Sequence, residues 1–390
     1  MHSQLPPRSL SVLQLVLDSG ERLPTLVDTA TWLPMRLATR WSVRYRRYRV
    51  QSSTLADNLR ILGKVYTWAW TVGGFDLDGF LISGNVLSAF QIQSLAEYFR
   101  MPEEVGKLLG ASSFDHHLEV AEEFLKWTLS STNRGGLSAF TTLEQLTSAY
   151  TQLEMIFESL HIGANPSQRI EPLTDEEIAT IRGAIAPTQN DNKEWVFPKS
   201  AFSKHTRLRN WVMFEVALGL GLRRGELLKL RMDCLPRGRD DGIRVLRLPD
   251  DPRDSRAREP AVKTAERILP ASRTLLHALR AYITSRPPLG RVQGKSPYLF
   301  VTRKGDPVSL DTADDIIEKI GQVSGVPLSW HSLRHTWSEK KAKQLSEVPN
   351  GSDILMYLGG WKNAESPKRY TKKTIELQAQ EWLRAHQDDE

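Results

Sequence analysis

Apolar residues in the first 160 positions recur with the period of a helix, and this pattern limits the possible folds more than any other feature. Between Thr54 and Trp70 they recur at steps of three and four, which is the spacing of one helix face. Similar segments occur at 88–101, 115–129 and 143–160, and turns containing glycine, serine or asparagine separate them. We therefore expect a mainly helical N-terminal half.

The segment 161–172 has the composition of a connection between domains, because it combines glycine, asparagine, serine and two prolines without an apolar period. Directly after it, Thr174 and Glu177 have the spacing of a capping box at a helix start. The sequence thus predicts three parts: a helical N-terminal domain over 1–165, a linker over 166–173 and a second domain over 174–390.

The second domain combines helices with a small sheet. A helical segment at 221–230 is followed by the branched run 243–248, and two more short strands are expected at 261–264 and 267–269. Helical patterns return from Ser272 onward. The expected fold class is therefore mainly α with a small antiparallel β-sheet, an α+β second domain beside a helical first domain.

Composition excludes several classes of protein. Fifty-two Lys and Arg against 46 Asp and Glu give a net charge of +6, too small for a histone-like polycation or a disordered polyelectrolyte. The single cysteine, Cys234, forms no internal disulfide, which favours the reducing cytoplasm. The apolar stretch 10–17 is interrupted by polar residues and lacks a cleavage pattern, and no run reaches the length of a membrane span. We expect no signal peptide and no membrane association.

The basic residues are concentrated in two segments. Residues 40–64 hold seven basic residues and one acidic residue, interleaved with aromatic rings, and residues 331–373 hold nine basic and four acidic residues. Such segments suit a phosphate backbone, and a solvated helix face is an equal alternative on charge alone. The candidates for DNA contact are Arg44, Arg46, Arg47, Arg49, Lys64, Lys362, Lys368 and Arg369.

Two arginines stand at a predicted helix start in the segment Gly-Leu-Arg-Arg-Gly-Glu-Leu, 221–227. A guanidinium there is unfavourable unless an anion lies nearby, because a helix N-terminus already carries partial positive charge. An anionic ligand is one explanation. The alternative is that Arg223 or Arg224 pairs with Glu226 or another acid of the protein.

A second polar motif is His-Ser-Leu-Arg-His at 331–335. His331 and Arg334 are three residues apart and therefore share a helix face. His331 and His335 have the spacing of a helical zinc pair, but Ser332 stands where a metalloprotease has glutamate, and no further ligand cluster is nearby. We expect no metal; an ordinary surface helix with two histidines is the alternative for this motif alone.

The third motif is Gly359-Gly360-Trp361, with Tyr370 nine residues after the tryptophan. Taken together and in this order, the three motifs and Lys263 resemble the catalytic domain of the tyrosine recombinases, or phage integrase family, over about residues 171–375. The helical N-terminal half is similar in pattern to the core-binding domain of that family.

The resemblance implies a role for each matching residue. Arg223 and Arg334 would bind the scissile phosphate, and Glu226 would support Arg223. Lys263, on a strand hairpin, would be the general acid, and His331 would orient or deprotonate the reacting group. Trp361 would stand where the family has histidine or tryptophan and donate its indole N–H to the phosphate. The implied nucleophile is Tyr370.

The implied activity is site-specific recombination of DNA through a covalent 3′-phosphotyrosine. Two permanently charged guanidiniums can hold the extra negative charge of the transition state without a metal. The phosphotyrosine keeps the bond energy for rejoining, so no ATP and no other cofactor is needed. The implied place of action is the nucleoid in the cytoplasm.

Two assignments stay open on the sequence alone. The long charged insertion 249–260 makes the register of the hairpin uncertain, so Arg258 and Arg267 compete with Lys263. Arg224 competes with Arg223, which is preferred because it directly follows Gly-Leu as in the family pattern.

The resemblance also implies partners. These are a double-stranded DNA recombination site, a homotetramer on DNA held by the tail beyond Tyr370, and an accessory directionality or bending protein; the tail could instead fold back on its own domain. The alternative functions are a catalytically silent DNA-binding relative, a strand-relaxing enzyme like the type IB topoisomerases, and a helical scaffold that binds another protein.

Overall fold

The chain forms two compact units, Met1–Gln168 and Arg169–Glu390, in a computed structural model. The residues that the structure describes are 9–101, 109–130, 142–163, 171–191, 195–198, 202–204, 206–236, 242–286, 297–363, 365, 367–368, 370 and 379–380.

The first unit begins with a β-hairpin. Strand β1 (Leu10–Val16) pairs antiparallel with β2 (Arg22–Asp28), from Leu10 opposite Asp28 to Val16 opposite Arg22. The turn between them contains Gly20, whose φ of 87° suits a residue without a side chain. This hairpin was not predicted, because the expectation of a helical N-terminal half came from the segments after residue 54.

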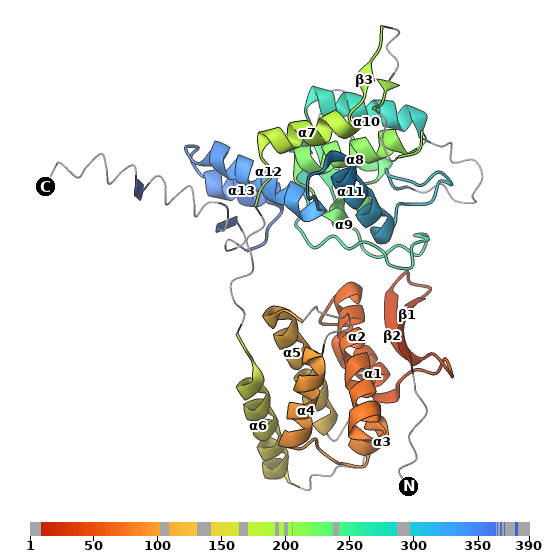
Figure 1. The fold of residues 1–390 in the computed structure, drawn as a ribbon, viewed down its shortest axis with the longest axis vertical. Helices are drawn as coiled ribbons and strands as arrows, with labels where there is room; N and C mark the ends of the chain where they lie inside the picture. The colour runs from red at the N-terminus through yellow and green to blue at the C-terminus, as the bar shows by residue number, and fades with distance from the viewer. Residues whose placement is uncertain are drawn as a thin grey trace, which may run out of the picture. The chain divides into compact units, whose positions relative to one another are not determined.

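Helices make up the rest of the first unit (Figure 1). They are α1 (Arg36–Trp41), the π-helical η1 (Ser42–Arg46), α2 (Ser52–Trp68), the π-helical η2 (Ala69–Gly73), α3 (Leu77–Ile82), α4 (Ala89–Arg100), α5 (Ala111–Leu129) and α6 (Leu143–Leu160). Fully buried aromatic rings from three of them meet in the core, where Trp41 and Phe124 pack edge to face with ring centroids 6.0 Å apart. Helix α2 also packs on β2, so the hairpin is part of this unit's fold.

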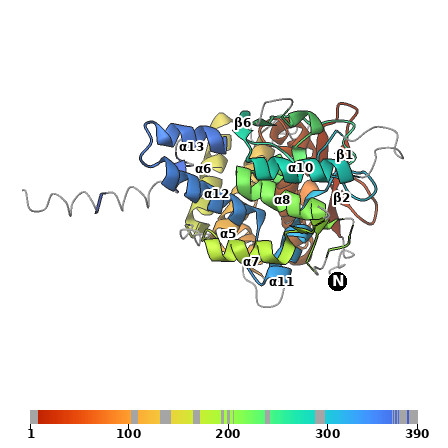
Figure 2. The ribbon, with the colours of Figure 1, turned by 90° about the horizontal axis from the view of Figure 1, so that it is seen from above.

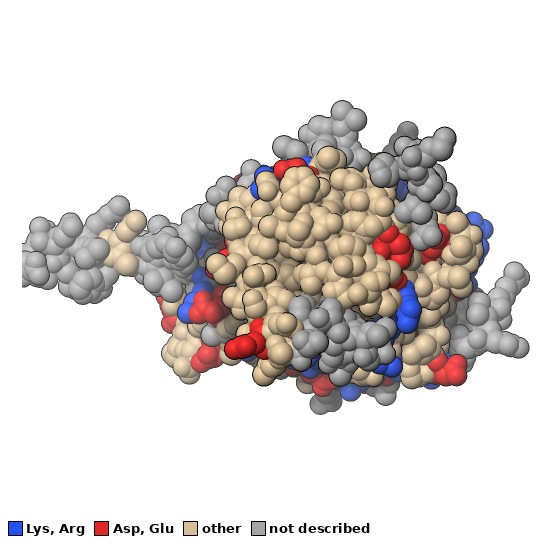
Figure 3. Space-filling view, turned by 90° about the horizontal axis from the view of Figure 1, so that it is seen from below, with Lys and Arg blue, Asp and Glu red and all other residues tan. Residues whose placement is uncertain are grey.

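Charge is unevenly spread over the molecular surface. Figure 3 shows one face on which Lys, Arg, Asp and Glu lie mostly near the edge, while the centre carries few of them.

The second unit is built on helices α7 (Asp175–Ile185), α8 (Arg207–Leu220), α9 (Arg224–Lys229), α10 (Arg273–Ser285), α11 (Leu310–Ser324), α12 (Trp330–Leu345) and α13 (Gly351–Gly359), with a 3₁₀ turn η4 (Met232–Cys234). The expected capping box at Thr174 and Glu177 begins α7. Helix α8 lies beside α10, and α12 beside α13 (Figure 2). Helix α8 is buried on most of its surface, because α10 and α12 both pack against it.

Four short strands form two antiparallel pairs in this unit. Strand β3 (Thr188–Gln189) pairs with β4 (Trp195–Val196), and β5 (Gly242–Val245) pairs with β6 (Arg267–Pro270). The strand expected at 261–264 is absent from the described structure. Because β5 already pairs with β6 and the Ala265 N–H donates to Gly360 O at 3.2 Å, this stretch has no strand to join.

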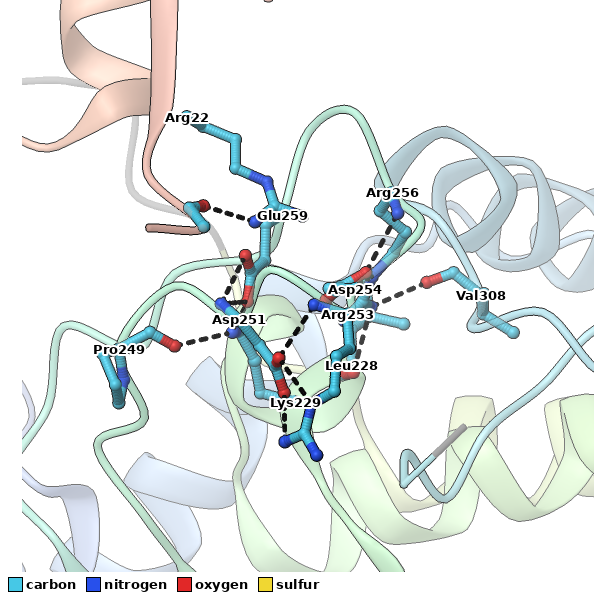
Figure 4. Close-up of polar contacts among 11 residues, drawn as sticks. Arg22, Leu228, Lys229, Pro249, Asp251, Arg253, Asp254, Arg256, Glu259 and Val308 are labelled. Atoms are coloured by element: carbon cyan, nitrogen blue, oxygen red, sulfur yellow. Dashed lines mark hydrogen bonds and ion pairs between the residues drawn. The ribbon is translucent and has the colours of Figure 1, made fainter. Parts of the chain in front are cut away.

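A long connection, residues 246–266, therefore joins β5 to β6. Arg256 fastens it: its guanidinium pairs with Asp254 at 2.6 Å and donates to the carbonyl oxygens of Leu228 and Val308 at 3.1 and 3.0 Å (Figure 4). The charged insertion is thus an ordered part of the fold that leads the chain past α9 toward Lys263.

Among the described helices, none combines the length and the apolar character that crossing a bilayer requires.

Candidate active site

A cavity of about 430 Å³ lies in the second unit, and most of the predicted site residues line it. Arg223 and Arg224 come from the start of α9, Lys263 from the connection before β6, and His331 and Arg334 from the first turns of α12. The arginines at 223 and 334, which are 111 positions apart in the sequence, therefore face one cavity.

The start of α9 is held by its own glutamate. The Arg223 backbone N–H donates to Glu226 Oε2 at 2.8 Å, which satisfies one of the unpaired donors at a helix start. A Cβ on Gly225 would lie 2.4 Å from the Ala261 carbonyl oxygen. Only glycine allows α9 to come this close to the connection, and that approach brings Lys263, which is exposed, to the same cavity as Arg223.

Glu226 lies beneath the cavity, 2% exposed, and binds several partners. Its two carboxylate oxygens accept from the Arg267 guanidinium at 2.9 and 3.0 Å and from the Thr264 hydroxyl, and Arg334 Nη1 lies 3.8 Å away. Burial alone would raise the pKa of Glu226, but the hydrogen bonds and charge of Arg267, and the charge of Arg334, lower it overall. Glu226 is therefore an ionised anchor for the arginines around it.

Arg334 is almost fully buried and is oriented by the protein backbone. Its two terminal nitrogens donate to Gly221 O at 2.6 Å and Gly359 O at 2.7 Å, and its guanidinium lies 4.9 Å from the Trp361 ring centroid. Burial, and then the positive charge of Arg223, lower the pKa of Arg334 to about 9, so it stays charged at neutral pH. An anion in the cavity would offset the repulsion between the two arginines.

Arg267 connects the site to the glycine turn. Besides binding Glu226, its Nε donates to Leu358 O at 2.8 Å, and a Cβ on Gly360 would lie 2.5 Å from its Nη1. Gly360 also has φ of 64°, which disfavours any other residue. The turn is thus fixed at the end of α13, and Trp361 follows it directly under Arg334.

Tyr370 is 6% exposed and lies between two rings of the site. Its ring centroid is 5.7 Å from that of Trp361 and 5.2 Å from that of His335. His335 in turn contacts His331, with 2.8 Å between their Nε2 atoms. Trp361 and Tyr370 do not line the cavity themselves, and the tyrosine is linked to it through two neighbouring rings: His335 contacts His331, and Trp361 contacts Arg334.

The competing arginines have other partners. Arg224 lines the cavity but forms an ion pair with Asp314 of α11, and Arg258 pairs with Asp311 at 3.1 Å on the surface. Arg267 is turned inward to Glu226. Of the three candidates for the hairpin cation, Lys263 is the one that lines the cavity. The described residues contain no cluster of His, Cys, Asp or Glu able to hold a metal ion.

The predicted DNA-contact residues differ in their surroundings. Arg44 and Arg49 are exposed, whereas Arg46 pairs with Glu123 at 2.8 Å and Arg47 with Glu21 at 2.5 Å. Lys64 is partly buried.

In the second unit Lys362 and Lys368 are exposed, and Lys368 forms an ion pair with Glu365. Arg369 and the tail, apart from 379–380, lie outside the described residues.

Two residues of the site were not predicted in their present roles. Thr264 and Arg267 both bind Glu226. The alternation of strand residues could have indicated that Arg267 is buried, because it shares a face with buried Leu269 while Ile268 between them is exposed. A charged residue on a buried strand face needs a charged partner, and Glu226 is that partner.

Comparison with known proteins finds relatives of this chain. Residues 199–376 match the phage integrase family. The chain is 25% identical over 214 residues to tyrosine recombinase XerA of Thermococcus kodakarensis, which covers 54% of this chain and 61% of the relative. It is 28% identical over 189 residues to tyrosine recombinase XerD of Listeria innocua, covering 47% and 57%. The chain thus spans less than two thirds of these relatives.

The fold is similar to a solved structure of the Tn1549 transposon integrase in complex with a circular intermediate DNA. The two share 15% identity with a TM-score of 0.54, over 88% of this chain and 98% of the other. The expected fold class, mainly helical with small antiparallel sheets, is confirmed. The family match falls on the unit that holds the cavity, so residues 199–376 are a phage integrase family domain, similar to the catalytic part of the tyrosine recombinases.

Proposed function

We propose that the chain is a site-specific DNA recombinase that cleaves and rejoins strands through a covalent 3′-phosphotyrosine at Tyr370. The observation that carries the proposal is the single cavity lined by Arg223, Lys263, His331 and Arg334, to which Tyr370 is joined by ring contacts. Three cations around one buried carboxylate leave the cavity with a positive excess, which suits a phosphodiester.

The chemistry follows from the residue types. Tyr370 Oη forms a bond to phosphorus as the bond from phosphorus to the 5′-oxygen breaks. His331 takes up the phenol proton, and Lys263 donates a proton to the leaving oxygen. Arg223 and Arg334 stabilise the charge on the non-bridging oxygens, and removal of either should lower the rate on the order of a hundredfold. Rejoining is the reverse of cleavage: the 5′-oxygen attacks the phosphotyrosine and the phenol leaves, so no ATP is needed.

The proposed partners follow from the same chemistry. The substrate is a double-stranded recombination site in the nucleoid; a DNA substrate is supported by the similar fold of the Tn1549 integrase, whose structure is in complex with a circular intermediate DNA. Four copies assemble on two sites through the tail beyond Tyr370, with an accessory directionality or bending protein. Exposed Arg44, Arg49, Lys362 and Lys368 supply contacts to the DNA backbone.

The proposal is tested with a suicide DNA substrate that carries a nick next to the cleavage point, after the bound sequence has been mapped. Wild-type protein should accumulate a covalent protein–DNA adduct in EDTA, and Tyr370→Phe should form none while binding the DNA equally. Tyr357→Phe, at an exposed tyrosine of the same unit, is the matched control and should cleave normally. An adduct in the Tyr370→Phe variant would place the nucleophile elsewhere.

A second measurement separates recombination from strand relaxation. Plasmids with two copies of the mapped site should exchange segments, whereas a supercoiled plasmid without the site should stay supercoiled. Rapid relaxation of the plasmid that lacks the site would indicate a topoisomerase-like enzyme instead.

A further inference from the structure

We infer that His335 is a positioning residue for the nucleophilic step: it sets the tautomer of His331 and aligns the ring of Tyr370. The inference deepens the proposed function and rests on it. His335 has no role in the mechanism above, yet it contacts both His331, the proposed proton acceptor, and Tyr370, the proposed nucleophile.

The contact between the two histidines fixes their protonation. Their Nε2 atoms are 2.8 Å apart, and the rings meet edge to face with centroids 4.3 Å apart. At this distance one nitrogen must carry a hydrogen and the other a lone pair, because two N–H groups or two lone pairs would repel. The pair therefore holds at most one positive charge in this geometry, and His335 determines which nitrogen of His331 carries the hydrogen.

Helix geometry keeps the two histidines within reach of each other. They are four residues apart on α12, whose start is capped by Ser329 accepting from the Ser332 N–H at 3.0 Å. Arg334, one turn after His331, donates to two backbone carbonyl oxygens and so holds this part of the helix against its neighbours. The helix thus presents both rings on the same face.

Tyr370 also packs against His335. The two ring planes are inclined at 59°, and Trp361 contacts Tyr370 from a second direction at 34°. A phenol held between two rings has few orientations left, which favours in-line attack. One imidazole ring therefore contacts both the nucleophile and the residue that takes its proton.

The arrangement has a consequence for the proton that leaves Tyr370. As the bond from Oη to phosphorus forms and the bond to the 5′-oxygen breaks, the phenol proton moves to the histidine pair, and Lys263 supplies the proton for the 5′-oxygen. The charged groups that line the cavity with His331 are Arg223, Arg224, Lys263, Arg334, Glu226 and Asp314; Glu339 lies one turn beyond His335 on α12, and Tyr370 contacts His335. Arg267 binds Glu226 and Arg224 binds Asp314, so the cavity keeps an excess of positive charge, which disfavours more than one added proton on the histidine pair.

The test measures single-turnover adduct formation on the suicide substrate from about pH 5 to 9, the range in which imidazoles titrate. His335→Phe keeps a ring against Tyr370 but has no nitrogen, and His335→Gln places an amide at a similar reach that can still hydrogen-bond to His331. His116→Phe, at an exposed histidine of the first unit, is the matched control. DNA binding and melting temperature are measured for each variant.

His335→Phe should lower the cleavage rate by about tenfold to a hundredfold, since a misplaced tautomer in a catalytic imidazole is costly. Its loss of the hydrogen bond to protonated His331 should lower the pKa of His331, so the acid limb of the profile should move to lower pH. His335→Gln should recover most of the rate, with an acid limb close to that of the wild type.

Several results would overturn the inference. One is a His335→Phe variant with the rate and pH profile of the wild type. Another is a rate loss of the same size in both variants with an unshifted acid limb, which would show a packing role alone. If His335→Phe does not fold, His335→Gln is compared with His335→Ala instead. A cleavage rate as low in His335→Gln as in His335→Ala would contradict the hydrogen-bond role. Failure of the wild type itself to form an adduct would instead overturn the proposed function.

Discussion

The second unit holds two buried arginine–carboxylate pairs, Arg256 with Asp254 and Arg267 with Glu226. In both pairs the side chains are nearly inaccessible to solvent. Arg256 gives its remaining donors to two backbone carbonyls of neighbouring segments, and its guanidinium lies 4.4 Å from the Tyr298 ring centroid (Figure 4). One carboxylate faces one guanidinium there, and the charges balance.

Glu226 is surrounded differently. Arg267 takes both of its oxygens, Arg334 lies 3.8 Å away and Arg223 4.0 Å away, so one negative charge faces three positive ones. The balanced pair fastens the connection between β5 and β6, whereas the unbalanced cluster leaves positive charge at a cavity. Burial of an arginine therefore does not indicate a binding site by itself. A buried arginine indicates an anion-binding site when too few carboxylates surround it.

The largest effect on folding stability is expected for Glu226→Ala. It leaves Arg267 and Arg334 buried without their carboxylate, and breaking such a pair costs about 3–5 kcal/mol. Urea unfolding measures the loss. Glu226→Gln, which keeps the shape and some hydrogen bonds, is the control and should lose less. A Glu226→Ala variant as stable as the wild type would contradict the anchoring role.

Arg256→Met should also destabilise the second unit, by about 3 kcal/mol, because Asp254 is left buried and unpaired. In contrast to Glu226→Ala, the folded fraction should form the DNA adduct at the rate of the wild type. Equal loss of cleavage per folded molecule in both variants would remove the distinction between the two pairs.

Acid should weaken both pairs. Burial opposes the charged form of Asp254, but the hydrogen bonds and charge of Arg256 outweigh it and lower its pKa, as Arg267 and Arg334 do for Glu226. A lowered folded-state pKa gives stability that is present above the unfolded value and is lost as pH falls through the folded value. Unfolding free energy should therefore fall below about pH 4, the unfolded range. Asp254→Asn and Glu226→Gln should each flatten this decline.

Arg223→Ala should change stability little while it lowers cleavage on the order of a hundredfold. The side chain is 36% exposed, and its charge opposes that of Arg334, so its removal relieves repulsion. Thermal unfolding and adduct formation are measured together. A clear loss of stability with normal cleavage would show that Arg223 belongs to the framework.

The smallest effect is expected for Arg253→Ala, next to the balanced pair in the sequence. Arg253 is 78% exposed and binds only Asp251 among the described contacts, so no resolvable change in melting temperature or cleavage should follow. It is the surface control for Arg256→Met, and a large effect would show that the connection depends on its charges in general.

Much of the helical framework followed from the sequence, because long apolar periods determine helices locally. The segments expected at 88–101 and 143–160 became α4 and α6 with nearly the same bounds. The N-terminal hairpin was missed, although Asp-Ser-Gly at 18–20 between two apolar runs is a turn signal. The strand expected at 261–264 was wrong because strand pairing depends on distant residues, here the register of β5 with β6.

The site residues also divide into those that the sequence predicted and those that it did not. The spacing of His331 and Arg334 predicted one helix face for both, and the family resemblance implied that Arg223 joins them; all three line the cavity. The motifs could not show that Arg267 turns inward, or that His335 bridges His331 and Tyr370, because these facts depend on packing between segments far apart in the chain.

The dependence of the cluster on Glu226 has one more consequence. Its partners come from α9, β6, α12 and the segment before β6, so they surround the carboxylate only after the whole unit has folded. Under the proposed mechanism, an incompletely folded polypeptide would carry the Tyr370 phenol without the arginines that bind a phosphate. Cleavage would then depend on complete folding of this unit.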